Sequence, residues 1–174
     1  MFRKIHKTAI VVAVLSLILT AAVPASLAQP QAPDFSLRAV DGPAVTSESL
    51  RGEVAVLAFG ASWLPLTRNQ MEGLKKLADQ YAGRGVVVYW ISTESDSSRS
   101  KNFVSDDELR NLGHKYKITV LRDPDGTISK RMGVAQVPAT VIINKQGQVS
   151  ATIGGLDPSA DLARQLAERL DKIL

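Results

Sequence analysis

The sequence predicts an α/β protein with a central mixed sheet flanked by helices, one half of the sheet parallel and the other an antiparallel hairpin. Two apolar runs, residues 54–59 and 86–91, are too short for good helices and have no polar face, which is typical of strands covered on both sides. Residues 65–81 between them have apolar side chains at helical spacing. This order predicts two parallel strands joined by a helix, and residues 140–143 and 148–153 predict the hairpin.

Turn and capping signals predict the remaining elements. Ser105 and Glu108 have the spacing of a capping box and predict the start of a second helix. Pro65 suits the first position of the helix that follows the first central strand, because its missing N–H would have no partner there. Asp157 and Pro158 predict the start of the last helix. The other expected elements are an edge strand at 35–37, a strand at 118–121, a brief helix at 128–132 and a buried stripe of Leu162, Leu166, Leu170 and Ile173 on the last helix.

The first 28 residues have the three parts of a secretory signal peptide. Three basic side chains precede an apolar run over residues 8–23, and Ser26 and Ala28 provide the small residues of a cleavage site. We therefore predict a signal peptide at 1–28, one domain at 29–174, and an exported protein, periplasmic or extracellular in a bacterium. An uncleaved leader that anchors the chain is the alternative. After cleavage, no stable membrane span is expected.

Composition narrows the functional classes. Removal of the leader, with its three basic side chains, leaves 146 residues and lowers the net charge from +4 to +1, so we expect no nucleic-acid partner. The sequence contains no cysteine, and His114 is its one histidine after the leader. We therefore expect neither a metal site nor a cofactor. Asp123 and Asp125 could contact a cation, but the D-P-D-G stretch that holds them is typical of a turn.

Four stretches resemble, in their order and spacing, the thioredoxin superfamily, especially the exported TlpA-like thiol-disulfide oxidoreductases and the redoxin group that includes the AhpC/TSA-type peroxiredoxins. They are residues 32–37, 61–68, 121–126 and 133–147. The resemblance covers nearly all of the chain after the leader. It implies a thioredoxin-like fold, a cis peptide bond between Val137 and Pro138 beside the first helix, and pairing of the Val137 backbone with an extended segment.

The chain departs from this family at the two positions that carry its chemistry. Trp63, Pro65 and Arg68 match the W-C-x-x-C-R motif, but Leu64 and Thr67 stand where the two cysteines would be. A thiolate is the nucleophile in every step of dithiol-disulfide exchange. A peroxiredoxin also needs a cysteine, so we predict a protein without thiol redox activity.

We expect the former active site to bind an extended protein segment through an apolar lip, a basic side chain and the proline loop. The candidate residues are Trp63, Leu64, Pro65, Leu66, Arg68, Val137 and Pro138. In the alternative, Leu64 and Leu66 fold inward and only fill space. Two other functions stay open: an oxidoreductase or antioxidant component that acts only with a cysteine-bearing partner, and a drifted paralogue without a site.

The first turn of the helix is a second place where chemistry is conceivable. Thr67 and Arg68 lie there, where free N–H groups and the helix dipole favour an anion. Thr67 as a nucleophile would need a base within hydrogen-bond reach. His114 is expected on a distant helix, and therefore we predict no catalytic role for Thr67.

Overall fold

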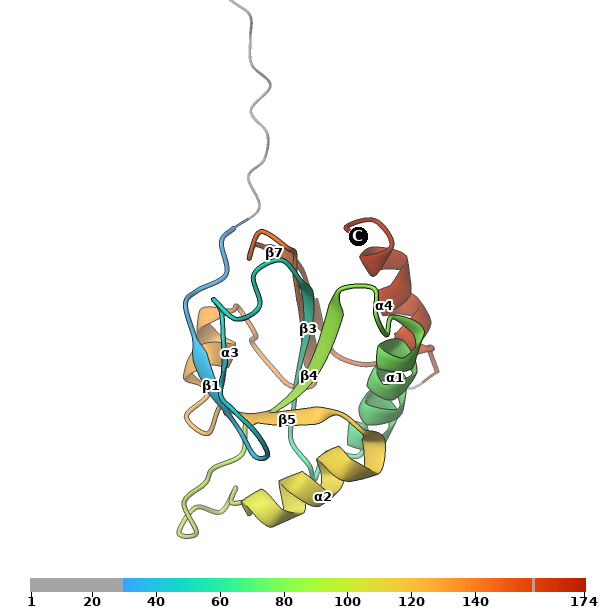
Figure 1. Cartoon of the computed structure of the whole chain (residues 1–174). Helices are drawn as coiled ribbons and strands as arrows, with labels where there is room; N and C mark the ends of the chain where they lie inside the picture. Colours follow the sequence, from blue (N-terminus) through green and yellow to red (C-terminus); the bar gives the residue numbers. More distant parts are fainter. Residues whose placement is uncertain (1–29, 158) are drawn as a thin grey trace, which may run out of the picture.

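The computed structural model describes residues 30–157 and 159–174, so the predicted signal peptide lies outside the described residues. One seven-stranded sheet with the order β2-β1-β5-β4-β3-β6-β7 forms the centre (Figure 1). Its strands are β1 (Ser36–Ala39), β2 (Val45–Thr46), β3 (Val54–Gly60), β4 (Val86–Ser92), β5 (Thr119–Arg122), β6 (Ala139–Ile143) and β7 (Val149–Gly154). The helices are α1 (Thr67–Gln80), α2 (Asp106–Tyr116), α3 (Thr127–Arg131) and α4 (Leu162–Leu170). In the described part of the chain, every helix is too short or too polar to cross a membrane.

The pairing of the strands confirms the predicted mixed sheet. β3 and β4 are parallel and in register from Val54 opposite Val86 to Gly60 opposite Ser92. β4 and β5 are also parallel, whereas β6 is antiparallel to both β3 and β7. The predicted edge strand is one position inside the edge, because β1 pairs with β5 on one side and with β2 on the other.

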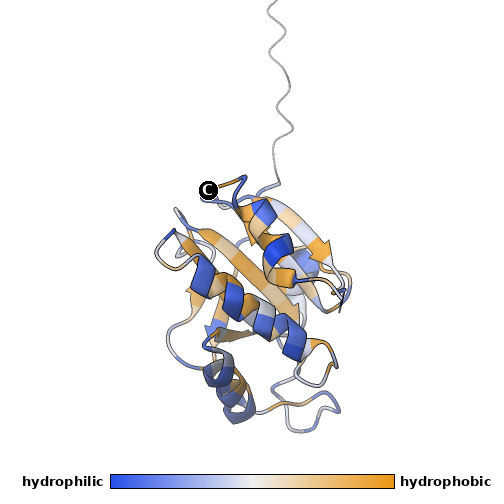
Figure 2. Ribbon diagram, turned by 90° about the vertical axis from the view of Figure 1, so that its right-hand side faces the viewer, coloured by the Kyte–Doolittle hydropathy of each residue, from blue (hydrophilic) through white to orange (hydrophobic). Residues whose placement is uncertain are grey.

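Two hydrophobic cores cover the two faces of the sheet. Every residue of β3 is buried, as the absence of a polar face in its sequence predicts. Helices α1, α2 and α4 pack on one face, and α3 and the N-terminal segment pack on the other. Figure 2 shows hydrophilic residues on the outward faces of the helices and hydrophobic residues along the strands beneath them. Side chains of β3 alternate between the two cores, which the sheet separates.

Two helices begin later than predicted. α1 begins at Thr67, because Pro65 occupies the second position of a turn that a hydrogen bond from the Thr67 N–H to the Leu64 carbonyl closes (3.0 Å). α4 begins at Leu162 with Asp161 as its N-cap, instead of at the predicted position four residues earlier. The start of α2 is as predicted, with both hydrogen bonds of the capping box present. In the predicted stripe of α4, the three leucines are buried and the isoleucine after the helix is half-buried.

Substitution of Gly60 tests how tightly the end of β3 is packed. A Cβ at this position would lie 2.8 Å from the Gln70 Oε1 and 2.8 Å from the Trp90 Nε1, two buried atoms that form a hydrogen bond of 2.9 Å. We expect Gly60→Ala to lower the free energy of unfolding by about 1–3 kcal/mol through overpacking. Chemical denaturation measures this change.

Gly154→Ala is the matched control, because Gly154 also ends a strand and a Cβ there would have open space. It should change the free energy of unfolding by less than about 0.5 kcal/mol. Equal effects of the two substitutions would contradict the packing described for Gly60.

Candidate functional site

Two segments form the centre of the candidate site: the motif turn, residues 61–66, and the proline loop, residues 133–138. The motif turn leaves β3 directly after Gly60, and the proline loop enters β6 at Ala139. In the antiparallel register of these strands, Phe59 lies opposite Ala139. The two segments therefore meet at one end of the sheet, and the structure brings together the motif and the proline that the sequence places more than 70 residues apart.

The motif turn presents four consecutive apolar residues at the surface. Trp63 is 67% exposed, the largest exposed fraction among the exposed large hydrophobic side chains of the described residues. Pro65 is exposed, whereas Leu64 and Leu66 are half-buried. A hydrogen bond of 3.1 Å from the Leu64 N–H to the Ala61 carbonyl closes the first half of the turn. The two leucines are thus neither fully inward nor fully outward, and each retains accessible apolar surface.

Thr67, the first residue of α1, holds the start of this turn. Its side chain is 4% exposed, and its hydroxyl donates a hydrogen bond of 2.6 Å to the Ala61 carbonyl. A carbonyl accepts a proton in a hydrogen bond but is no general base, so this contact does not activate the hydroxyl. Among the described residues, no hydrogen bond joins His114 to Thr67, because the His114 side chain in α2 lies with its Nε2 3.1 Å from the Asp41 Oδ2.

Few side-chain groups compensate the positive end of the helix dipole at the N-terminus of α1. Its N-cap residue, Leu66, provides no side-chain hydrogen bond, and its first turn contains no acidic residue. Arg68 is exposed in that turn, and its Nε donates to the Glu72 Oε1 at 2.9 Å. The Glu72 carboxylate raises the pKa of Arg68. The helix dipole and Arg68 therefore give this end of the site a positive character.

The proline loop exposes backbone groups beside the motif turn. The peptide bond between Val137 and Pro138 is cis, and both residues are half-buried. Among the described residues, no hydrogen bond is formed by the backbone N–H or carbonyl of Val137, whereas the Pro138 carbonyl accepts from the Gly155 N–H at 2.9 Å. A recess of ≈ 210 Å³, lined mainly by small and apolar residues of this loop and of β7, runs along it.

Glu94, which was not among the residues predicted for the site, fixes the position of the motif turn. This residue follows the end of β4 and is only 1% exposed. Its carboxyl oxygens accept hydrogen bonds from the Ser62 N–H (2.8 Å), the Ser62 hydroxyl (2.8 Å) and the Ser92 hydroxyl (3.0 Å). A buried carboxyl group is costly unless it is satisfied in this way. The contact therefore ties the motif turn to β4.

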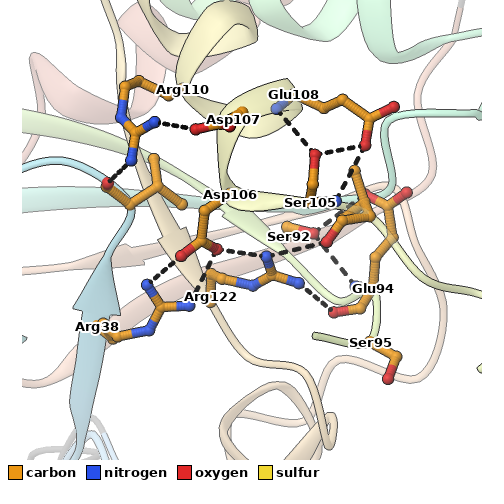
Figure 3. Close-up of polar contacts among 12 residues, drawn as sticks. Arg38, Ser92, Glu94, Ser95, Ser105, Asp106, Asp107, Glu108, Arg110 and Arg122 are labelled. Atoms are coloured by element: carbon orange, nitrogen blue, oxygen red, sulfur yellow. Dashed lines mark hydrogen bonds and ion pairs between the residues drawn. The ribbon is translucent and has the colours of Figure 1, made fainter. Parts of the chain in front are cut away.

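A buried guanidinium closes the loop that follows Glu94. Arg122, at the end of β5, donates to the carbonyl of Glu94 (3.3 Å) and to the Asp106 Oδ1 (2.6 Å), as Figure 3 shows. It also donates to the carbonyl of Val104 (3.1 Å). Residues 94–104, here called the 94–104 loop, therefore have both ends held by one side chain. Such compact loops with close ends are frequently functional.

Asp106, at the start of α2, joins this loop to β1, the strand that pairs with β5. Its carboxylate accepts two hydrogen bonds from Arg38 of β1 (2.7 and 3.0 Å) in addition to the one from Arg122 (Figure 3). These bonds, those of Arg38 first, lower the pKa of Asp106 from 3.8 to about 2. The carboxylate is thus stabilised in its charged form at the start of α2, where the helix dipole also favours negative charge.

The 94–104 loop also contacts the motif turn directly. The Trp63 Nε1 donates a hydrogen bond of 3.0 Å to the Asn102 Oδ1. Within the loop, the Ser95 N–H donates to the Asn102 carbonyl at 2.8 Å, which holds Asn102 in place. The position of Glu94, two residues after the end of an apolar strand, is the one sequence signal for this arrangement, because the ends of parallel strands meet at one edge of the sheet.

These features define a thioredoxin-like protein: a mixed sheet with helices on both faces, a turn from β3 into α1, and a cis-proline loop beside that turn. Residues 28–152 match the AhpC/TSA family, and the chain belongs to this family. The resemblance that the sequence predicts is thereby confirmed, together with the absence of both cysteines.

The relatives of the chain include thiol oxidoreductases. The thiol:disulfide interchange protein DsbE of Pseudomonas aeruginosa is 30% identical over 154 residues, which cover 87% of this chain and 80% of DsbE. The thiol-disulfide oxidoreductase ResA of Bacillus thuringiensis is 27% identical over 143 residues, 82% of this chain and 76% of ResA. The solved structure of the lipoprotein thioredoxin Etrx1 from Streptococcus pneumoniae superposes with a TM-score of 0.61 at 27% identity, over 78% of this chain and 99% of that chain.

The charged state of Asp106 makes stability depend on pH. Because its pKa is lower in the folded protein than the usual 3.8, its stabilising effect is complete well above pH 3.8 and is lost as the pH falls through about 2. Asp106→Asn should therefore lower the free energy of unfolding at pH 7 by about 1–2 kcal/mol, a value reduced for the partial exposure of the carboxylate. The difference from the wild type should shrink between pH 4 and pH 2. Urea denaturation across this range measures it, and a pH-independent difference would contradict the assignment.

Proposed function

We propose that the protein is an exported, non-catalytic module that binds an extended segment of a partner protein between the motif turn and the proline loop. Export rests on the signal-peptide pattern of residues 1–28. The binding role rests on the site, in which the parts suited to docking a segment are present and the two sulfur positions are occupied by Leu64 and Thr67.

The observation that carries this proposal is the free backbone of Val137. Its N–H and carbonyl have no hydrogen-bond partner among the described residues, although the residue is half-buried at the end of a sheet. An extended segment supplies the alternating donors and acceptors that such a position lacks, as in strand addition. The recess along the proline loop offers space for one of its side chains. The half-exposed leucines of the motif turn provide apolar contact on the other side.

The names of the relatives favour a second function, that of an oxidoreductase component acting with a cysteine-bearing partner. DsbE is a thiol:disulfide interchange protein, and ResA is a thiol-disulfide oxidoreductase. This chain has no thiol of its own, so any exchange would have to take place between sulfur atoms of other molecules. The buried, hydrogen-bonded hydroxyl of Thr67 offers no substitute nucleophile. The site therefore supports binding better than turnover.

Aspartate substitutions at the site test the binding function. Leu64→Asp and Val137→Asp place a charge in the apolar part of the surface, and desolvation of that charge should abolish capture of a partner from a native cell-envelope extract. Capture is followed by mass spectrometry, and circular dichroism checks that each variant is folded. Gln165→Asp, on the exposed face of α4, is the matched control and should capture as the wild type does. Capture that is unchanged in both site variants would remove the proposed site.

A turbidity assay of insulin reduction with dithiothreitol tests the absence of redox activity. The wild type should give the uncatalysed rate, because it provides no thiolate. In the same assay, the double variant Leu64→Cys/Thr67→Cys should exceed that rate. It provides both cysteines of the motif, next to a proline loop that retains the family arrangement. Turnover by the wild-type protein would contradict the proposed function.

A further inference from the structure

Two exposed aromatic side chains lie on segments that a hydrogen bond joins. Apart from the C-terminal Leu174, Trp63 (67% exposed) and Phe103 (42% exposed) are the large hydrophobic side chains exposed in the described residues. Phe103 follows Asn102, whose side chain accepts the hydrogen bond of the Trp63 indole. Exposed aromatic residues are enriched where proteins bind partners, because they bury a large area with few rotatable bonds. Their concentration beside the proposed site extends that site onto the 94–104 loop.

Contacts within the chain hold the 94–104 loop at its neck and at its tip. Arg122 fixes its two ends, and a β-bridge pairs Ser95 with Phe103 across its neck. Hydrogen bonds from the Ser100 N–H to the Ser97 carbonyl (2.9 Å) and from the Asn102 N–H to the Ser100 hydroxyl (3.2 Å) order its tip. A surface that is already ordered loses little conformational entropy on binding.

The exposed charges of this loop are mainly positive. Arg99 and Lys101 are exposed, and neither forms an ion pair within the described residues. The one exposed acidic residue of the loop is Asp96, which, more weakly than Asp106, raises the pKa of Arg38 and thus acts on the β1 side. Arg68 at the start of α1 is also exposed, but its charge is paired with that of Glu72. Two unpaired basic groups on the loop that carries Phe103 attract acidic residues of a partner.

We infer that the aromatic patch of Trp63 and Phe103, together with Arg99 and Lys101, selects extended protein segments in which an aromatic or large aliphatic residue lies next to acidic residues. The segment's backbone pairs with the proline loop, its apolar side chain covers the aromatic patch, and its carboxylates face the basic side chains. This inference rests on the proposed function, because it adds a preference to the same site. A protein segment fits better than a lipid surface, which offers no backbone groups to Val137.

Selection from a library of random twelve-residue peptides displayed on phage tests this preference on the purified protein. The wild type should enrich peptides with an aromatic or large aliphatic residue flanked by aspartate or glutamate. The variant Arg99→Glu/Lys101→Glu should lose this bias and enrich basic peptides instead, because charge reversal exchanges the preferred partner. Phe103→Ser should weaken binding of the selected peptides at least tenfold. The control Arg164→Glu/Lys172→Glu makes the same charge change on the exposed side of the α4 region and should keep the acidic preference.

The outcomes separate this inference from the proposed function. The inference is overturned if the enriched peptides need Leu64 and Val137 but show no acidic bias. It is also overturned if the charge-reversal variant enriches peptides with the same bias as the wild type. Both results leave the binding function in place. Absence of enrichment on the wild type overturns both. Sedimentation with phosphatidylglycerol vesicles tests whether the same surface binds a membrane instead of a protein segment. Vesicle binding that is lost in Arg99→Glu/Lys101→Glu, without any peptide preference, would assign the patch to a membrane surface and overturn the inference.

Discussion

Burial of β3 on both faces is the constraint on which the arrangement of the site depends. Val56 and Ala58 face the core beneath α1 and α4, whereas Leu57 and Phe59 face the core beneath α3. A shift of the strand by one residue would exchange these two sets and force the larger side chains into the space of the smaller ones. The register is therefore fixed, and it determines where β3 ends. Because β3 ends at Gly60, opposite the end of β4 and next to the start of β6, the motif turn and the proline loop must meet.

Buried polar contacts fix the segments that follow β3 in the same place. The buried amide of Gln70 accepts from the Trp90 indole at 2.9 Å, and the Thr67 hydroxyl and the Glu94 carboxyl group hold the two ends of the motif turn. A buried polar group that loses its partner costs about 1–3 kcal/mol. Each of these contacts therefore penalises alternative conformations of the turn. The rigidity of the site follows from satisfied buried polar groups and does not require a disulfide.

The parts of the fold with a strong local signal could be predicted from the sequence. The two central strands have uninterrupted apolar runs, and α2 has a complete capping box. The predicted starts of α1 and α4 are wrong for a local reason. Pro65 suits both the first position of a helix and the second position of a turn, and Asp157 and Asp161 both precede the last helix with the residue type of an N-cap.

The parts of the site that depend on long-range partners could not be predicted. Arg122 and Glu94 are single charged residues at the ends of strands, and nothing in their neighbours in the sequence indicates that both are buried. Their partners become visible only when the strand order is known, because Glu94 follows β4 whereas Ser62 follows β3. The apolar lip and the proline loop could be expected from the family resemblance, and the 94–104 loop that completes them could not.

Because the two sulfur atoms are absent, this surface can hold a partner only through non-covalent contacts. A mixed disulfide retains a partner through a covalent bond, even when few other contacts exist. A site with Leu64 and Thr67 in these positions must offset the lost translational and rotational freedom of a partner, about 4–15 kcal/mol, by non-covalent contacts alone. The motif turn by itself offers a small area for this. Continuity of the turn with the proline loop and with the 94–104 loop enlarges the available surface, and the proposed binding function without thiol chemistry depends on this continuity.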